Sequence, residues 1–220
     1  MSYSFQFRDV FAAKDALLDG LLLTIQLTAT TIAIGFVIGI AVAAASVYGS
    51  SRVRSAAHVY VEAIRNTPLL VQLFLVFFGL PSLGIRLDVI TVCTLALAIN
   101  LGAYTAEIVR AGLESIPRSQ VEAGLSLGLS GWQVFRQIVL VPALKNVYPS
   151  LTSQFVLMML ATSVVSQISA PELFYAGSII QSRTFRDFEV YTVIAAVYLV
   201  LSFLLRGGFA VCYRLLFRRA

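Results

Sequence analysis

Residues Ser115–Leu144 read SIPRSQVEAGLSLGLSGWQVFRQIVLVPAL and form a moderately polar insert between two long apolar segments. Ser119 followed three residues later by Glu122 has the spacing of a capping box, which begins a helix. Gly128 is placed to end that helix about two turns on. The stretch therefore predicts a short helix at about residues 120–127, outside the bilayer. Nothing in lipid requires such a helix, so we expect it to dock onto another protein.

The composition around this insert excludes an ordinary soluble domain. Of the 220 residues, 59% are hydrophobic and only 12% are charged, and a soluble fold could not hide that much apolar surface. Several stretches reach the ~20 apolar residues that cross a ~30 Å hydrocarbon core. The sequence thus predicts an all-α transmembrane protein made of one domain, residues 1–220. The net charge of +5 fits basic loops at a membrane better than a nucleic-acid partner.

The apolar runs predict five spans. In chain order they are Leu21–Tyr48, Tyr60–Leu80, Asp88–Arg110, Val134–Ser166 and Val190–Tyr213. Ser130 and Gln133 repeat the capping-box signal before the fourth span. That span is long and carries Pro142 and Pro149 near its start, so we expect a bend where the prolines remove backbone donors.

Lysine and arginine are divided unequally between the two sides of these spans. If the N-terminus lies outside, eleven of them are inner and five are outer, which is the asymmetry expected of a chain with its C-terminus in the cytoplasm. The inner set is Arg52, Arg54, Arg65, Arg110, Arg118, Arg136, Lys145, Arg206, Arg214, Arg218 and Arg219, and the outer set is Arg8, Lys14, Arg86, Arg183 and Arg186. The predicted short helix at 120–127 is then cytoplasmic.

Catalytic motifs are missing from the sequence. It has no G-x-x-x-x-G-K-[ST] phosphate loop and no His/Cys/carboxylate cluster spaced for a metal. The one histidine, His58, is expected to be a solvated loop residue, and Cys93 and Cys212 to be packing residues without a disulfide. These features argue against an enzyme and for a subunit that takes energy from a partner.

Two polar stripes lie within the predicted spans. Asn100, Tyr104 and Glu107 recur at i, i+4 and i+7 in the third span, and Arg110 is placed to pair with Glu107. For Asn100 and Tyr104, a helix-packing seam and a pathway lining are about equally supported, whereas a structural role is favoured for Glu107.

The fourth span carries the second stripe. At 100° per residue, four polar residues fall within about a third of a turn, and Gln154 points the other way. The four are Thr152, Ser163, Ser166 and Gln167. We expect both stripes to face one cavity. By contrast, Gly35-x-x-x-Gly39-x-x-x-Ala43 in the first span predicts only close helix packing.

Four segments together resemble one known family along nearly the whole chain. They are GLLLTIQLT at 20–28, EAIRNTPLLVQLFLVFFGLP at 62–81, GAYTAEIVRAGLESIP at 102–117, and the region from Glu122. The chain is similar to the permease subunits of ABC importers for polar amino acids, of the histidine, glutamine, arginine and glutamate type.

This resemblance implies a five-helix type I ABC importer permease in a bacterial inner membrane. It implies a second permease, identical or paralogous, two cytoplasmic ABC ATPases that bind ATP-Mg, and an extracytoplasmic solute-binding protein. No cofactor is expected in this chain. The family's coupling helix, which sits in a groove of the ATPase, corresponds to Glu122, Ala123, Gly124 and Gly128 here.

The chain departs from the family pattern at three places. Gly124 stands where the family usually has alanine, which weakens a helix by about 1 kcal/mol. Pro142 comes one residue later than the family's proline. Leu160-Ala161 replaces a Lys-Asp pair that many members have, so the family's substrate pocket does not transfer directly.

The sequence therefore predicts the membrane subunit of an ATP-driven amino-acid importer. The amino acid carried, and whether the membrane part has a specific substrate site, stay open. A self-sufficient secondary transporter or channel is the main alternative, with Glu107 and Asn100 as its one candidate ion site. A non-transporting scaffold fits poorly with two polar stripes.

Overall fold

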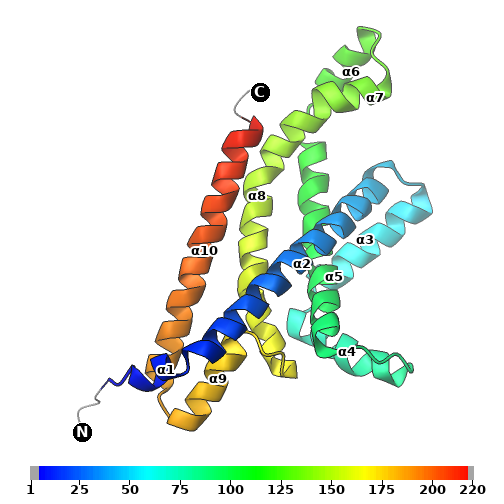
Figure 1. Cartoon of the computed structure of the whole chain (residues 1–220). Coiled ribbons are helices and arrows are strands. Elements are labelled where there is room, and N and C mark those ends of the chain that lie inside the picture. Colours follow the sequence, from blue (N-terminus) through cyan, green and yellow to red (C-terminus); the bar gives the residue numbers. More distant parts are fainter. Residues whose placement is uncertain (1–4, 218–220) are drawn as a thin grey trace.

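The computed structural model describes residues 5–217, which form helices and connecting turns without a β-strand among them. Four long helices dominate: α2 (Lys14–Tyr48), α5 (Val89–Glu114), α8 (Leu140–Ala161) and α10 (Asp187–Phe217). Figure 1 shows α2 crossing α5, with α8 and α10 beside them. The shorter elements are α1 (Arg8–Ala12), α3 (Ser51–Arg65), α4 (Leu69–Ser82), α6 (Arg118–Ser126), α7 (Gly131–Val134), a π-helix (Phe135–Val139), a 3₁₀-helix (Thr162–Ile168) and α9 (Leu173–Thr184).

The all-α transmembrane class is confirmed. Within residues 5–217, four helical stretches are long and apolar enough to cross a membrane, and α3 with α4 makes a fifth if the bent pair counts as one span. The four are Lys14–Tyr48, Val89–Glu114, Gly131–Ile168 and Asp187–Phe217. These agree with four of the five predicted spans, although each is longer than predicted.

The predicted second span, Tyr60–Leu80, is wrong as one straight helix. Helices α3 and α4 meet at an angle of 106°. The cause is Pro68, which lacks a backbone donor and disfavours helical geometry at the residue before it. The side chain of Gln72 holds the corner, because its amide nitrogen lies 2.7 Å from the carbonyl oxygen of Ile64 and 3.0 Å from that of Thr67.

The small-residue face of α2 packs on α5, as predicted. A Cβ atom at Gly39 would lie 2.4 Å from side-chain carbons of Thr105, and one at Gly35 would lie 2.9 Å from the Cβ atom of Leu101. Only glycine permits the two backbones to approach so closely. The α5–α8 contact is equally tight, because a Cβ atom at Gly112 would lie 1.9 Å from Val147.

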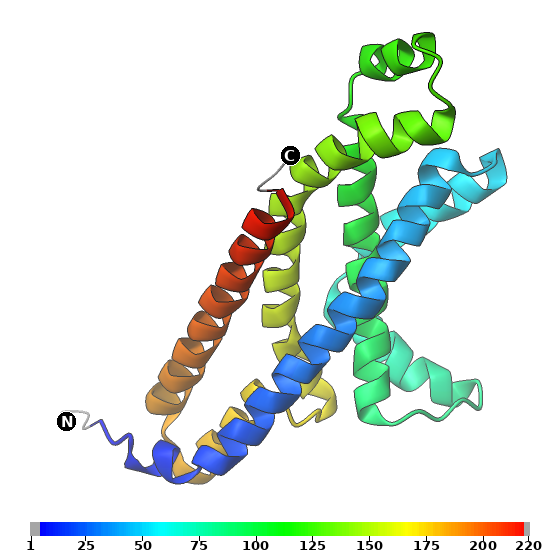
Figure 2. The same ribbon diagram turned by 45° about the horizontal axis from the view of Figure 1, so that its top comes forward.

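The fourth span bends near its start, as the prolines predicted. A π-helix precedes Pro142 at the beginning of α8, and Figure 2 shows the segment from α7 onward turning away from the lower part of α8. A π turn holds one more residue than an α turn and commonly kinks a helix.

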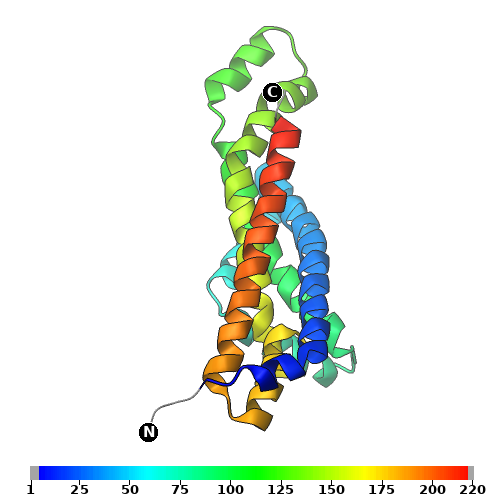
Figure 3. The same cartoon turned by 60° about the vertical axis from the view of Figure 1, so that its left-hand side comes forward.

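The end of the molecule opposite α6 is closed by α1, α9 and the start of α10 (Figure 3). No helix was predicted from the sequence at α9 (Leu173–Thr184). Glu172, fully buried, caps α9 by accepting hydrogen bonds from the backbone N–H groups of Phe174 and Tyr175, and the hydroxyl of Tyr198 donates to it. The N–H of Leu173 donates to the hydroxyl of Thr24, which ties α9 to α2.

Three single-residue predictions can be checked here. Cys93 is buried and Cys212 is exposed, and neither forms a disulfide. Cys93 is thus a packing residue as predicted, whereas Cys212 is not enclosed by the fold. His58 is exposed but lies in α3 and not in a loop. Arg218 and Arg219 lie outside the described residues.

Candidate functional site

A polar cavity of about 540 Å³ lies at the break between α3 and α4. The break supplies one wall, α5 a second and α8 a third. The lining residues are Arg65, Asn66, Thr67, Pro68, Leu69, Asn100, Tyr104, Gln154, Leu157, Met158 and Ala161. Broken helices of this kind expose helix ends within the membrane, where they can bind a polar solute.

Hydrogen bonds connect two walls of the cavity. The side chain of Asn100 donates to the Oε1 atom of Gln72 at 2.9 Å, and both residues are buried. The guanidinium of Arg65 lies 5.5 Å from the ring centre of Tyr104, in a cation–π contact. The side chain of Gln154, half-buried, has no hydrogen-bond partner among the described residues. Its amide is therefore free to bind a solute.

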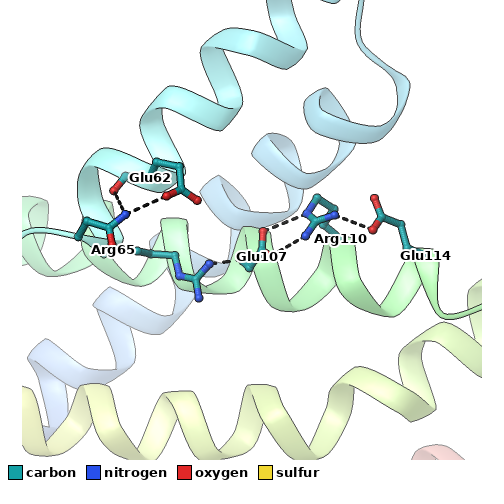
Figure 4. Close-up of polar contacts among 6 residues, drawn as sticks. Glu62, Arg65, Glu107, Arg110 and Glu114 are labelled. Carbon is teal, nitrogen blue, oxygen red and sulfur yellow. Dashed lines mark hydrogen bonds and ion pairs between the residues drawn. The ribbon is translucent and has the colours of Figure 1, made fainter.

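A row of paired charged side chains extends along α5 from this cavity (Figure 4). Arg110 forms a bidentate pair with Glu107, at 2.6 and 3.0 Å, and reaches Glu114 at 2.6 Å. Arg65 approaches Glu107 from α3 at 3.9 Å. The predicted pairing of Glu107 with Arg110 is confirmed. Since Glu107 is held by two arginines, it is poorly suited to bind a coupling ion alone.

Only one of the two predicted polar stripes lines the cavity. Asn100 and Tyr104 line it, whereas Thr152, Ser163, Ser166 and Gln167 do not. The hydroxyls of these residues donate to carbonyl groups one turn earlier in their own helix, and the amide of Gln167 lies beside Ser166. The expected facing of the two stripes is thus wrong for α8, and Gln154, which was predicted to point away, is the polar residue of α8 at the cavity.

Two physical reasons explain this error. Periodicity places residues around a helix, but only tertiary contacts decide which side meets a cavity. In addition, the 3₁₀-helix from Thr162 advances about 120° per residue, so Ser163, Ser166 and Gln167 do not continue the α-helical pattern of Thr152.

The short exposed helix exists, but it begins differently from the prediction. Helix α6 starts at Arg118, directly after Pro117, and no side chain caps it. The Ser119–Glu122 capping box is therefore wrong, since the helix starts two residues earlier than predicted, directly after the fixed φ of Pro117. Glu122 is exposed and does not cap α6.

The end of α6 agrees with the prediction. Gly128 has φ +81°, its N–H donates to Leu125, and the N–H of Leu129 donates to Gly124, which together make a Schellman motif. The capping box of Ser130 and Gln133 at the start of α7 is also confirmed.

Helix α6 buries one side and exposes the other. Gly124 is buried, and a Cβ atom there would lie 2.4 Å from Ile138 in the π-helix. Ala123 and Glu122 are exposed, and Leu125 and Leu127 are 51% and 82% exposed. Exposed large apolar side chains of this kind can belong to a contact surface.

Several site residues were missed from sequence, namely Arg65, Gln72 and Gln154. Asn66-Thr67-Pro68 was a usable signal, because a proline after two polar residues interrupts an otherwise apolar run. Gln72 is the single amide in the apolar run Leu69–Leu80, and such residues usually bond within the protein.

Comparison with known proteins decides the family. Residues 35–218 match the family described as "Binding-protein-dependent transport system inner membrane component". The chain belongs to this family. It is 35% identical over 208 residues to the glutamine transport system permease protein GlnP of Escherichia coli, covering 92% of this chain and 95% of that protein. It is 36% identical over 191 residues to the probable glutamine ABC transporter permease protein GlnM of Bacillus subtilis, covering 87% and 88% of the two chains.

Solved structures agree with this membership. A chain from the crystal structure of an amino acid ABC transporter with histidines is 34% identical, with a TM-score of 0.89, covering 96% of this chain and 99% of that one. A chain of the inward-facing MetNI methionine ABC transporter is 18% identical with a TM-score of 0.75, which shows a shared fold. The chain is thus an ABC importer permease, and the alternative of a self-sufficient secondary transporter is set aside.

Proposed function

We propose that this chain is the membrane subunit of an importer for polar amino acids, driven by ATP hydrolysis in separate cytoplasmic subunits. The cavity at the broken helix is the observation that carries the proposal, because it sets polar groups inside the apolar part of the chain. Relatives named for glutamine, octopine and L-cystine transport support the substrate class.

The cavity offers suitable groups for a zwitterion. A polar solute in lipid-like surroundings must keep its hydrogen bonds, since each unsatisfied group costs several kcal/mol. Arg65 and the unpaired N–H groups at the start of α4 favour a carboxylate. The amide of Gln154 can both donate and accept, and the side chain of Tyr104 also lines the cavity. Substrate contacts are therefore assigned to Arg65, Tyr104 and Gln154. Asn100 is assigned a structural role, because its hydrogen bond to Gln72 links α5 to α4 in the cavity wall.

Two glutamines permit a matched test of this assignment. Gln154→Leu removes cavity hydrogen bonds worth about 0.5–1.5 kcal/mol each, so uptake should fall about three- to tenfold. Gln167→Leu makes the same change at an exposed site outside the cavity and should leave uptake unchanged. Both are measured as ATP-dependent uptake in vesicles that contain the complete transporter. Equal uptake by the two variants would remove Gln154 from the pathway.

The assembly follows from the family and from the exposed side of α6. A second permease, identical or paralogous, completes the pathway, and an extracytoplasmic solute-binding protein delivers the amino acid. Helix α6, with Glu122, Ala123, Gly124 and Gly128, couples the chain to the ATPase that binds ATP-Mg. Closure of the ATPases then moves the permease halves between inward- and outward-open states.

The orientation that we propose has the N-terminus outside and the C-terminus in the cytoplasm. Among the described residues, it places α6 and the cations around it on the cytoplasmic side, as the bias of inner loops toward Lys and Arg requires. The membrane is a bacterial inner membrane, in keeping with the family description.

A further inference from the structure

An apolar groove opens between α2, α5 and α8, near their ends on the α6 side. Its volume is about 180 Å³, and it exposes no polar atom. The walls come from α2, α5, the π-helix and α8, and they include Ala44, Tyr48, Val109, Phe135 and Val147. The transport mechanism proposed above makes no use of it.

The groove faces away from the polar pathway. At 100° per residue, Val109 in the groove wall lies about 180° around α5 from Asn100 in the polar cavity. The contact of Val147 with Gly112 closes the seam between α5 and α8. The groove and the polar cavity thus open on different sides of α5.

The rim of the groove has the chemistry of a membrane interface. The ring centre of Phe135 lies 6.4 Å from that of Tyr48 and 5.7 Å from that of Trp132, on which it stacks. The side chain of Trp132 is 68% exposed. Tyrosine and tryptophan concentrate at headgroup depth. Two exposed cations are close in sequence to lining residues: Arg136 follows Phe135 in the π-helix, and Arg52 lies in the first turn of α3, after Tyr48 at the end of α2. An anionic headgroup complements this charge.

We propose that the groove binds one acyl chain of an anionic phospholipid from the leaflet nearest α6, with the lipid phosphate among the rim cations. Apolar cavities of about 150 Å³ stay dry and take up small hydrocarbons, so this groove can hold part of an acyl chain. Because the groove adjoins both α2 and the bend before α8, a bound chain stabilises the corner that carries α6. This goes beyond the proposed transport function, and lipid occupancy can be measured without uptake.

Two alanines of α2 give a matched pair for the test. Ala44 lines the groove, whereas Ala41 does not, and both are exposed. Ala44→Leu fills the space of about three methylene groups, so the amount of retained lipid should fall about tenfold or more. Ala41→Leu adds the same atoms outside the groove and should retain lipid like the parent protein.

The measurement is native mass spectrometry of the full chain, released in mild detergent from vesicles of equal phosphatidylglycerol and phosphatidylcholine. The parent protein should carry phosphatidylglycerol in preference, and Arg136→Gln should reduce that preference. Equal lipid retention in the two leucine variants would overturn the proposal, as would equal retention of both lipids by the parent. A cross-link between two permeases through Ala44→Cys would also overturn it, because a second chain would then occupy the groove.

Discussion

The buried carboxylate of Glu172 offers the sharpest test of how the end of the molecule opposite α6 is held together. It accepts the N–H of Phe174 at 2.9 Å, the N–H of Tyr175 at 2.7 Å and the hydroxyl of Tyr198 at 2.7 Å. The residue has no exposed surface. Glu172→Ala would leave three donors without an acceptor where α2, α9 and α10 meet.

The size of the effect follows from these three bonds. A buried donor left without a partner costs about 1–3 kcal/mol, so three donors that lose one shared acceptor cost about 3–5 kcal/mol together when the structure relaxes partly around them. We expect Glu172→Ala to lower the free energy of unfolding by about 3–5 kcal/mol. At about 2–4 °C per kcal/mol for a chain of this size, the Tm should fall by about 6–20 °C.

The two cysteines allow the unfolding to be measured directly. Cys93 is buried and Cys212 is exposed, so in a Cys212→Ser background the labelling of Cys93 by a maleimide reports thermal unfolding. Glu122→Ala removes an exposed glutamate and should change stability by no more than about 0.5 kcal/mol. A Tm of Glu172→Ala equal to that of Glu122→Ala would refute the assigned role.

The same residue gives stability a pH dependence of known sign. Burial raises the pKa of Glu172 above the usual 4.5, against the opposing effect of its hydrogen bonds. A raised pKa means that the folded state binds the proton more tightly than the unfolded state. The stability gained is therefore present below pH 4.5 and is lost as the pH rises through the raised pKa. Glu172→Gln should remove this dependence, and an unchanged pH profile of the Tm would contradict it.

Three further predictions concern packing, docking and orientation. Gly39→Leu must separate α2 from α5, costing about 1–3 kcal/mol or more, whereas Gly79→Leu meets no atom within 4 Å and should leave Cys93 labelling unchanged. Leu127→Asp should weaken copurification of the ATPase without changing the Tm, because Leu127 is 82% exposed; normal copurification would exclude this surface. Single cysteines at Ser51, Ser82 and Arg183, labelled on intact cells with an impermeant reagent, should react only at the last two sites, and outside labelling at Ser51 would reverse the proposed orientation.

The helix ends and the helix contact that depend on local sequence could be predicted. Gly128 ends α6 because its φ of +81° suits glycine, and Ser130 caps α7 with its own side chain. The Gly35-Gly39 face also follows from spacing alone. The break at Pro68 had a local signal too, but the apolar residues on both sides of it concealed that signal.

The remaining features depend on tertiary contacts. Gln154 and Thr152 are both polar residues of α8, and no pattern within the helix says that the α3–α4 corner lies beside Gln154 and not beside Thr152. The importance of Gln72 likewise arises only once the chain bends, since its bonds join Ile64, Thr67 and Asn100. The α9 helix was missed because it lies outside the apolar runs and is capped by a buried acid.

The glycine at position 124 lets α6 pack closely on the start of the fourth span, at a cost in helix stability. Glycine costs α6 about 1 kcal/mol of helix stability relative to alanine, but an added Cβ atom would lie 2.4 Å from Ile138 and 3.1 Å from Val134. Glycine thus lets α6 lie directly on α7 and the π-helix, while the caps at Gly128 and Ser130 fix the turn between them (Figure 2). Since α5 ends at Glu114 and α6 begins at Arg118, the helix that lines the cavity and the helix exposed for docking are three residues apart. If α6 docks as proposed, we expect its displacement to move α7 and the π-helix, on which it packs, and through them the start of the fourth span.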